Sequence, residues 1–326
     1  MKLRLRVPAT TANIGPGFDS LGLALSLYNW FTLEPAAATS VSGCEEKYSG
    51  KDNLFLKALD YASGLLGKPT PVLRLAIDAR IPVARGLGSS ATMIVGGVAA
   101  ALLLSEGWEG LVQGRKKLSS EELGFILEAS AALEGHPDNV TPALYGGFCV
   151  AVAQAGSGQA GSGQAAILSS RCEVDPGWRF HALIPPFELE TAKARAALPA
   201  LLPRADAVFN LGRAALLALA FARKDPTLLG AACDDRIHQP YRKALIAGYD
   251  EVMAACHEAG AAAAWLSGAG PTLIALTAPG AASAGQPTAD SFERHVGTIL
   301  AARPEGAWRM ESLAADPDGL IYAFEE

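Results

Sequence analysis

The sequence predicts an α+β protein of two domains. Its 326 residues suggest about two domains. Half of the residues are hydrophobic and 18% are charged, which is the composition of a globular protein with sizeable cores. Strand patterns and helix patterns alternate in both halves of the chain. We place the boundary near residue 172, which gives an N-terminal domain at 1–172 and a C-terminal domain at 173–326.

Net charge, cysteine spacing and the length of apolar runs indicate which partners this protein does not bind. The net charge of −6 argues against a nucleic-acid-binding or anionic-membrane surface. The five cysteines are widely spaced and form no Cys-x-x-Cys pair, so neither a zinc site nor a disulfide framework is predicted. The longest apolar run, residues 93–104, is too short to span a bilayer. We therefore expect a cytoplasmic protein without nucleic-acid or membrane partners.

The first strand is predicted by alternation. Leu3, Leu5 and Val7 alternate with charged residues, which is typical of a strand with one buried face. Pro8 is expected to end it. Residues 9–19 contain Gly-Pro-Gly, which enforces a turn and excludes regular structure.

Strands and helices follow along the rest of the first half. Residues 21–33 are expected to form strands with Tyr28, Trp30 and Phe31 packed inside. Further strands are predicted at residues 73–78 and 147–152, and helices at 54–62, 91–104 and 119–133. The helix that begins near Ser119 has the hydroxyl-then-acid pattern of an N-terminal cap.

The second half has the same mixture. Two stretches are low in complexity and are expected to be loops, at residues 156–164 and 281–287. Regular elements are predicted for strands at 178–185, 272–277 and 319–324, and for helices at 208–222 and 245–258.

A glycine-rich turn joins the strand at 73–78 to the apolar helix. Glycine permits a positive φ and close approach to a ligand, and a helix start offers unpaired N–H groups to an anion. The turn lacks the lysine of a P-loop, and Glu106 follows a helix instead of the second strand that a dinucleotide fold requires. Two interpretations stay open: a phosphate loop of a third kind, or a tight helix-start turn capped by serine.

Three segments together resemble the GHMP kinases, a family of small-molecule kinases. They lie at residues 8–19, at 82–91 with the pattern Pro-x-x-x-Gly-Leu-Gly-Ser-Ser-Ala, and at 267–272. The resemblance covers essentially the whole chain. It implies an N-terminal domain like domain 2 of ribosomal protein S5, a ferredoxin-like C-terminal domain, and ATP with Mg²⁺ between them.

Within that family the chain most resembles the homoserine kinases. The N-terminal segment and residues 134–140 and 238–242 carry this finer resemblance. It implies phosphorylation of the terminal hydroxyl of L-homoserine to O-phospho-L-homoserine, a step of threonine biosynthesis, and it suggests a homodimer.

The resemblance also implies a set of acceptor-binding residues. A carboxylate calls for guanidinium groups, and Arg195 and Arg242 match the family's positions for this role. Asp19 would accept from the ammonium group. The other expected contacts come from Asn13, His136, Asp138 and Asn139. For Asn13 and Asp19 the alternative is a turn residue that bonds its own backbone.

The implied nucleotide and metal residues form a second set. Magnesium needs hard oxygen ligands, for which we favour Ser90 and Glu128, with Glu134 as the rival. Asn53 would lie near adenine or would simply cap a helix. The expected ATP-binding residues are Asn53, Pro82, Arg85, Gly86, Leu87, Gly88, Ser89, Ser90, Ala91, Thr92, Gly268, Gly270 and Thr272.

The expected chemistry is direct attack of the acceptor hydroxyl on the γ-phosphate. Positioning and charge neutralisation dominate phosphoryl transfer. The resemblance to homoserine kinases implies a site without a well-placed general base, and the sequence leaves open whether any side chain acts as one. Asn139, Thr191 and Arg195 are the expected catalytic residues, with Thr191 at a helix start orienting the hydroxyl. The alternatives are a GHMP kinase for another small alcohol and a non-catalytic nucleotide-binding protein of the same fold.

Overall fold

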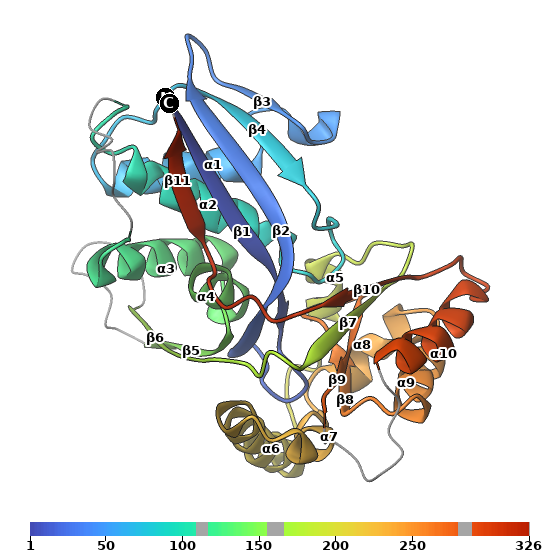
Figure 1. Ribbon diagram of the computed structural model, residues 1–326. Helices are drawn as coiled ribbons and strands as arrows, with labels where there is room; N and C mark the ends of the chain where they lie inside the picture. Colours follow the sequence, from blue (N-terminus) through green and yellow to red (C-terminus); the bar gives the residue numbers. More distant parts are fainter. Residues whose placement is uncertain (109–116, 155–165, 280–288, 326) are drawn as a thin grey trace.

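Two β-sheets with helices packed against them make up the molecule (Figure 1). The computed structural model describes residues 1–108, 117–154, 166–279 and 289–325. The two expected loops at 156–164 and 281–287 lie outside the described residues. The strands are β1 (Lys2–Ala12), β2 (Leu21–Pro35), β3 (Ser40–Ser42), β4 (Leu73–Ala79), β5 (Phe148–Gln154), β6 (Ala166–Cys172), β7 (Arg179–Ile184), β8 (Ala263–Leu266), β9 (Leu273–Thr277), β10 (Arg309–Leu313) and β11 (Ile321–Glu325).

Helices connect these strands. The α-helices are α1 (Leu54–Leu65), α2 (Ser89–Leu103), α3 (Ser120–Glu134), α4 (Pro137–Tyr145), α5 (Thr191–Ala196), α6 (Arg204–Arg223), α7 (Leu229–Ala232), α8 (Gln239–Arg242), α9 (Tyr249–Glu258) and α10 (Ala289–Ala301). Short 3-10 turns are η1 (Glu46–Tyr48), η2 (Pro226–Leu228) and η3 (Lys243–Leu245). Every strand and helix predicted from sequence is present. The additional strands are β3, β6, β8 and β10, and the additional α-helices are α4, α7, α8 and α10.

The first sheet has the order β11-β1-β2-β4-β3, and β5 pairs with both β2 and β6. Helices α1 to α4 cover one face of this sheet (Figure 1). The alternation in β1 works as predicted, because Leu3, Leu5 and Val7 are fully buried beneath these helices. Ser119 forms the predicted cap of α3, and its hydroxyl accepts from the Glu122 amide at 3.2 Å.

Pro8 does not end β1, contrary to the sequence prediction. The register of β1 against β2 shifts between Pro8 and Ala9, and pairing then continues to Ala12. Such an irregularity accommodates a residue that cannot donate to the ladder. The irregular segment therefore starts only at Asn13. Tyr28 and Trp30 are also misplaced by the prediction: Phe31 is buried, whereas these two rings lie half-buried.

The second sheet is antiparallel with the order β10-β7-β9-β8. Counted within this sheet, that is strand order 4-1-3-2, the arrangement expected for a ferredoxin-like domain. Helices α9 and α10 pack on one face, around Val252 and Phe292. On the other face the sheet shares a core with α6, α7 and the ends of strands from the first sheet.

The chain crosses between the two sheets twice. It leaves the first sheet after β6, which ends at Cys172. It returns at the end, because β11 pairs with β1 from Lys2↔Glu325 to Arg6↔Ile321. The first and last strands therefore lie side by side (Figure 1).

Within the described residues, α6 is the one helix whose length and apolar character would suffice for a membrane span. A lone helix of this kind is a weak indication, because core helices of globular proteins share these properties.

Candidate functional site

The glycine-rich turn between β4 and α2 has an unusual backbone. Ala84, Gly86 and Gly88 all have positive φ, at 52°, 75° and 69°. Gly88 is the N-cap of α2 and provides no side-chain hydrogen bond, so serine does not cap this helix. The first N–H groups of a long buried helix are thus left facing the turn, which is the geometry of an anion site.

The three sequence segments meet at this turn. The Thr10 amide donates to the Leu87 carbonyl at 3.1 Å. The Ser267 hydroxyl donates to the Gly86 carbonyl at 2.6 Å, and the Thr272 amide donates to the Arg85 carbonyl at 3.3 Å. Each bond joins residues far apart in sequence, so the turn is fixed from both sheets.

The glycines make this close packing possible. A Cβ on Gly86 would collide with the carbonyl oxygen of Ser267 and come within 2.9 Å of that of Gly270. A Cβ on Gly88 would collide with the hydroxyl of Thr10. Positive φ disfavours side chains at both positions as well.

One cavity opens beside the turn, with a volume of about 110 Å³. We call it the arginine cavity. It is lined by Asn13, Asp19, Ala84, Arg85, Gly86, Gly88, Ser89, Ser90, Glu134, His136, Asp138, Asn139, Leu189, Thr191, Arg195, Arg242, Gly268, Ala269 and Gly270. It therefore brings together all the expected acceptor-binding and catalytic residues.

Asp19 and Arg195 are paired with each other in this cavity. Arg195 donates to both carboxylate oxygens of Asp19, at 2.8 and 3.1 Å. The hydrogen bond to Asp19 raises the pKa of Arg195, so the guanidinium group stays positively charged. The two groups expected to bind opposite ends of an amino acid are thus hydrogen-bonded to each other.

Arg242 is in a different position, with only 2% of its surface exposed. It donates to the carbonyls of Gly268 at 3.1 Å and Ala194 at 3.3 Å, and Nη1 lies 3.4 Å from Nδ1 of His238. Within the described residues it makes no ion pair. Burial, and then the nearby charge of Arg195, lowers the pKa of Arg242 to about 10.

The segment from His136 to Asn139 forms the start of α4, a helix that the sequence did not predict. Proline at the first helical position favours a start there. His136 Nδ1 and Asp138 Oδ1 are in hydrogen-bond contact, and the Thr10 hydroxyl donates to Asn139 Oδ1 at 2.7 Å. Burial opposes a charge on His136, but the hydrogen bond to Asp138 and the surrounding carboxylates outweigh it and raise its pKa.

Asn13 makes a contact within the turn and also lines the arginine cavity. Its Oδ1 accepts from the Asp19 amide at 3.0 Å, as a turn residue would. Its Nδ2 donates to the Gly268 carbonyl at 2.9 Å, and the residue lines the arginine cavity.

The structure brings Glu134, and not Glu128, to Ser90. The Ser90 hydroxyl donates to Glu134 Oε2 at 2.7 Å, and both line the arginine cavity. Glu128 is absent from that lining. Both glutamates are on α3, but six residues correspond to about one and two-thirds turns of helix, so the two side chains leave different faces. Burial is the main cause that raises the pKa of Glu134.

A second cavity of about 790 Å³ adjoins the first. We call it the apolar cavity. It shares Ala84, Ser89, Ser90 and Thr191 with the arginine cavity, so the two meet at the glycine-rich turn. Its other lining residues are Gly43, Cys44, Glu45, Tyr48, Asn53, Leu54, Ala79, Ile81, Pro82, Val83 and Met93.

Asn53 lines the apolar cavity and also caps α1. Its Oδ1 accepts from the amides of Phe55 and Leu56, at 3.0 and 3.3 Å. Its Nδ2 donates to the Tyr48 carbonyl at 2.8 Å. The helix-cap role is thus present, beside a position suited to a ligand.

Several expected nucleotide residues do not face either cavity. Leu87, Ala91 and Thr92 are buried in the core, and Thr272 is fully buried. The Thr92 hydroxyl donates to the Ser89 carbonyl at 2.8 Å, so its contact is with the turn itself. The Arg85 guanidinium lines the arginine cavity, but it donates to the carbonyls of Val83, Pro185 and Pro186.

Sequence reasoning missed some residues at the site. Leu189 and Ala269 line the arginine cavity, and Ala84 lines both cavities. Ala84 and Ala269 stood inside the recognised segments but are apolar, so no chemical signal marked them. Asp235 lies behind the cavity, where it accepts from four N–H groups.

Comparison with known proteins agrees with this geometry. The pattern of the GHMP kinases N terminal domain matches residues 53–147, and that of the GHMP kinases C terminal domain matches residues 217–289. The chain belongs to the GHMP kinase family, and is therefore a phosphotransferase with the two-domain fold of that family.

Its similar relatives include homoserine kinases. One from Clostridium botulinum (strain Alaska E43 / Type E3) is 36% identical over 321 residues, 98% of each chain. One from Picosynechococcus sp. is 42% identical over 293 residues, covering 85% of this chain and 87% of the relative.

Solved structures show the same fold. The homoserine kinase from Cytophaga hutchinsonii gives a TM-score of 0.76 at 24% identity, covering 99% of this chain and 97% of the other. The L. major mevalonate kinase, solved with R-mevalonate, gives 0.66 at 16% identity, covering 96% and 95%.

Proposed function

We propose that this protein is a homoserine kinase that transfers the γ-phosphoryl group of ATP to the terminal hydroxyl of L-homoserine. One observation carries the proposal. Two cavities of opposite character meet at an anion-binding helix start, and the polar one contains two arginines and a carboxylate pair suited to an amino acid. The nucleotide would occupy the apolar cavity, with its phosphates at Gly86, Gly88 and Ser89.

Magnesium would be held by Ser90 and Glu134. Their oxygen atoms are the hard donors that Mg²⁺ prefers, and they already lie 2.7 Å apart beside the phosphate site. When bound, the ion would neutralise charge on the phosphate oxygens. This assignment replaces Glu128, which lies on another face of α3.

The acceptor would bind in the arginine cavity by exchanging partners. Its carboxylate would take donors from Arg195 and Arg242, and its ammonium would take acceptors from Asp19 and Asp138. The Asp19–Arg195 pair supports this assignment, because it holds complementary charges in place before the acceptor arrives. Opening such a partly exposed pair costs little free energy.

The transfer would need no general base. Asp138 is the nearest candidate, but its carboxylate is engaged by His136 and Asn139. The hydroxyl oxygen of the acceptor would attack phosphorus directly, and the bond to the leaving ADP oxygen would break. The hydroxyl proton would pass to the transferred phosphoryl group. Asn139 and Thr191 would orient the hydroxyl, since Thr191 lines both cavities.

Release of ADP with a panel of acceptors tests this function. The panel contains L-homoserine, L-serine, L-threonine and mevalonate, with ATP and Mg²⁺ in excess. We expect the highest kcat/KM with L-homoserine. Formation of ADP with mevalonate but not with L-homoserine would refute the proposal and leave a GHMP kinase for another alcohol.

Three further expectations are part of the proposal: a cytoplasmic location, a domain division near residue 172 and a homodimer. Exposed apolar side chains along α6 support self-association, since Val208, Leu211 and Leu219 are 62%, 71% and 48% exposed. Sedimentation of the wild type and of a Leu211→Glu variant tests the dimer.

A further inference from the structure

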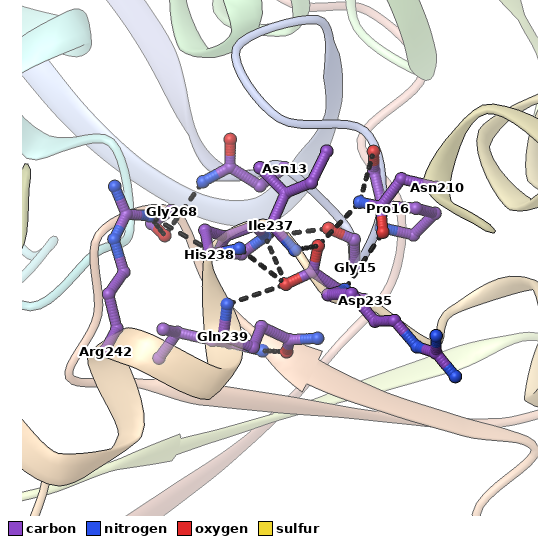
Figure 2. A network of polar contacts seen from close by, with 12 residues as sticks. Asn13, Gly15, Pro16, Asn210, Asp235, Ile237, His238, Gln239, Arg242 and Gly268 are labelled. Carbon is purple, nitrogen blue, oxygen red and sulfur yellow. Dashed lines mark hydrogen bonds and ion pairs between the residues drawn. The ribbon is translucent and has the colours of Figure 1, made fainter. Parts of the chain in front are cut away.

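Asp235 anchors a buried polar network behind the arginine cavity (Figure 2). Its Oδ1 accepts from Asn210 Nδ2 at 2.7 Å and from the Ile237 amide at 2.9 Å. Its Oδ2 accepts from the amides of His238 at 3.0 Å and Gln239 at 2.6 Å. A buried carboxylate is tolerated when several donors satisfy it. The phosphoryl transfer described above does not use this group.

His238 lies between the acceptor-site elements and is fully buried. Its Nε2 contacts the Gly15 carbonyl at 2.7 Å, and a carbonyl can only accept, so Nε2 carries the proton. Nδ1 is then an acceptor, and it faces Arg242 Nη1 at 3.4 Å. Burial is the main cause that lowers the pKa of His238, in agreement with a neutral ring.

The network thus connects the N-terminal turn to Arg242. On one side His238 donates to Gly15, two residues from Asn13, which lines the cavity. On the other side it accepts from Arg242, whose remaining partners are the carbonyls of Ala194 and Gly268. All three partners are neutral, so the positive charge of Arg242 stays available to an incoming anion.

We propose that Asp235 and His238 are positioning residues that hold Arg242 for the α-carboxylate of the acceptor. Asp235 fixes the backbone of His238 at the start of α8, and His238 fixes the guanidinium. The pair therefore sets the preference for acceptors that carry a carboxylate. This inference rests on the proposed function, because it assigns Arg242 to the acceptor carboxylate.

Two replacements of His238 separate its two contacts. In His238→Gln the amide nitrogen can replace Nε2 toward Gly15, but the acceptor toward Arg242 is lost. In His238→Asn the amide oxygen can replace Nδ1 toward Arg242, but the donor toward Gly15 is lost. His257→Gln is the matched control, because His257 is exposed.

The measurement is kcat/KM for L-homoserine and for 3-amino-1-propanol, which is the same acceptor without its carboxylate. We expect His238→Gln to lower the value for L-homoserine by about tenfold, the worth of one hydrogen bond to a charged group, and to leave that for 3-amino-1-propanol nearly unchanged. His238→Asn should restore most of the preference, and His257→Gln should match the wild type. An equal fall for both acceptors would overturn the proposal.

A double variant tests whether His238 acts through Arg242. Once Arg242→Gln has removed the guanidinium, adding His238→Gln should cause no further loss with L-homoserine. Additive losses would contradict the proposal. If the variants at His238 do not fold, the ¹⁵N chemical shifts of the His238 ring in the wild-type protein test the network instead. The network requires the proton on Nε2, so a ring protonated at Nδ1 would contradict the proposal. Wild-type protein that phosphorylates no amino acid would instead refute the proposed function.

Discussion

Ser90 and Glu134 occupy a corner where the glycine-rich turn meets the end of α3. Under the proposed function Glu134 would hold the metal instead of Glu128, because the Ser90 hydroxyl contacts Glu134 and not Glu128. We predict that Glu134→Gln lowers kcat by at least about tenfold and raises the Mg²⁺ concentration for half-maximal activity, because one charged ligand is lost. Titration of activity with Mg²⁺ at saturating ATP measures both effects.

Glu128→Gln is the matched control, on the same helix and with the same change of charge. It should leave the Mg²⁺ titration unchanged. The opposite result, loss of activity in Glu128→Gln alone, would return the metal to the residue favoured by sequence.

The raised pKa of Glu134 predicts a pH dependence. A carboxyl with a raised pKa keeps its proton to a higher pH than an ordinary glutamate, and a metal requires the deprotonated form. As pH falls toward that pKa, protons compete with Mg²⁺, so more Mg²⁺ should be needed for half-maximal activity. Titrations between about pH 5.5 and 8 measure this. The dependence should flatten in Glu134→Gln, and a constant requirement in the wild type would contradict the prediction.

Side-chain roles were only partly predictable at this scale. Asn13, Asp19, His136 and Asp138 carry polar groups within recognised segments, and all four line one cavity. Glu128 was favoured because it lies eight residues before His136, which is the spacing that the family resemblance implies for a magnesium ligand. Spacing along a chain does not by itself determine toward which neighbouring element a helical side chain points.

Among the elements, the turn before α2 depends most strictly on glycine. Gly88→Ala combines positive φ with a collision against Thr10. We predict a loss of stability greater than about 1 kcal/mol and a marked rise in the KM for ATP, because relieving the collision must move the turn. Thermal unfolding and kinetics with varied ATP measure the two effects.

Gly124→Ala is the corresponding control within a helix. Among the described residues, no heavy atom outside the local backbone of α3 would lie within 4 Å of the added methyl group, and α3 is helical at this position. The substitution should stabilise the protein by about 0.5–1 kcal/mol and leave the KM for ATP unchanged. If Gly88→Ala behaved like Gly124→Ala, the turn would not be constrained as described.

Elements with clear periodicity were predicted well, and exceptions have local causes. Leu73, Leu75 and Ile77 alternate and form β4. Pro8 was expected to end β1, but the pairing with β2 continues past it after a shift of register between Pro8 and Ala9. The sequence of β1 alone does not show this shift, because it depends on the partner strand. The helix α4 was not predicted for two reasons. Its first residues were interpreted as binding residues instead of as a helix start, and Pro142 within it is a residue that usually interrupts helices.

At the scale of the whole molecule, one of the hydrophobic cores contains residues from both sheets. Phe148 of β5 stacks on Phe221 of α6, with ring centroids 4.2 Å apart and an interplanar angle of 6°. The ring of Trp178 packs against the same ring of Phe221, with centroids 5.4 Å apart. We predict that Phe221→Ala lowers the free energy of unfolding by about 3–5 kcal/mol, because it leaves a cavity that both sheets line.

Urea unfolding followed by circular dichroism and by tryptophan fluorescence measures this loss. The two curves should coincide in the wild type, because both sheets depend on the shared core. Arg223→Gln on the same helix should change stability by less than about 0.5 kcal/mol, since Arg223 is exposed in the last turn of α6. Two separate wild-type transitions would show that the sheets unfold independently.

The pairing of distant strands could not be predicted from residue patterns. Alternation identifies a strand and its buried face, but it does not name the neighbour. The strand predicted near residue 319 was therefore assigned to the C-terminal domain by position in the chain, whereas β11 pairs with β1.

That pairing has a consequence for how the protein is made. The first sheet needs β11 beside β1, so it cannot be completed until residue 325 has emerged from the ribosome. Until then β1 exposes an unpaired edge in the nascent chain, the kind of edge that recruits foreign strands. A stall or premature stop before residue 321 would leave a chain without β11 and with this edge open, and such a chain would be a substrate for chaperones.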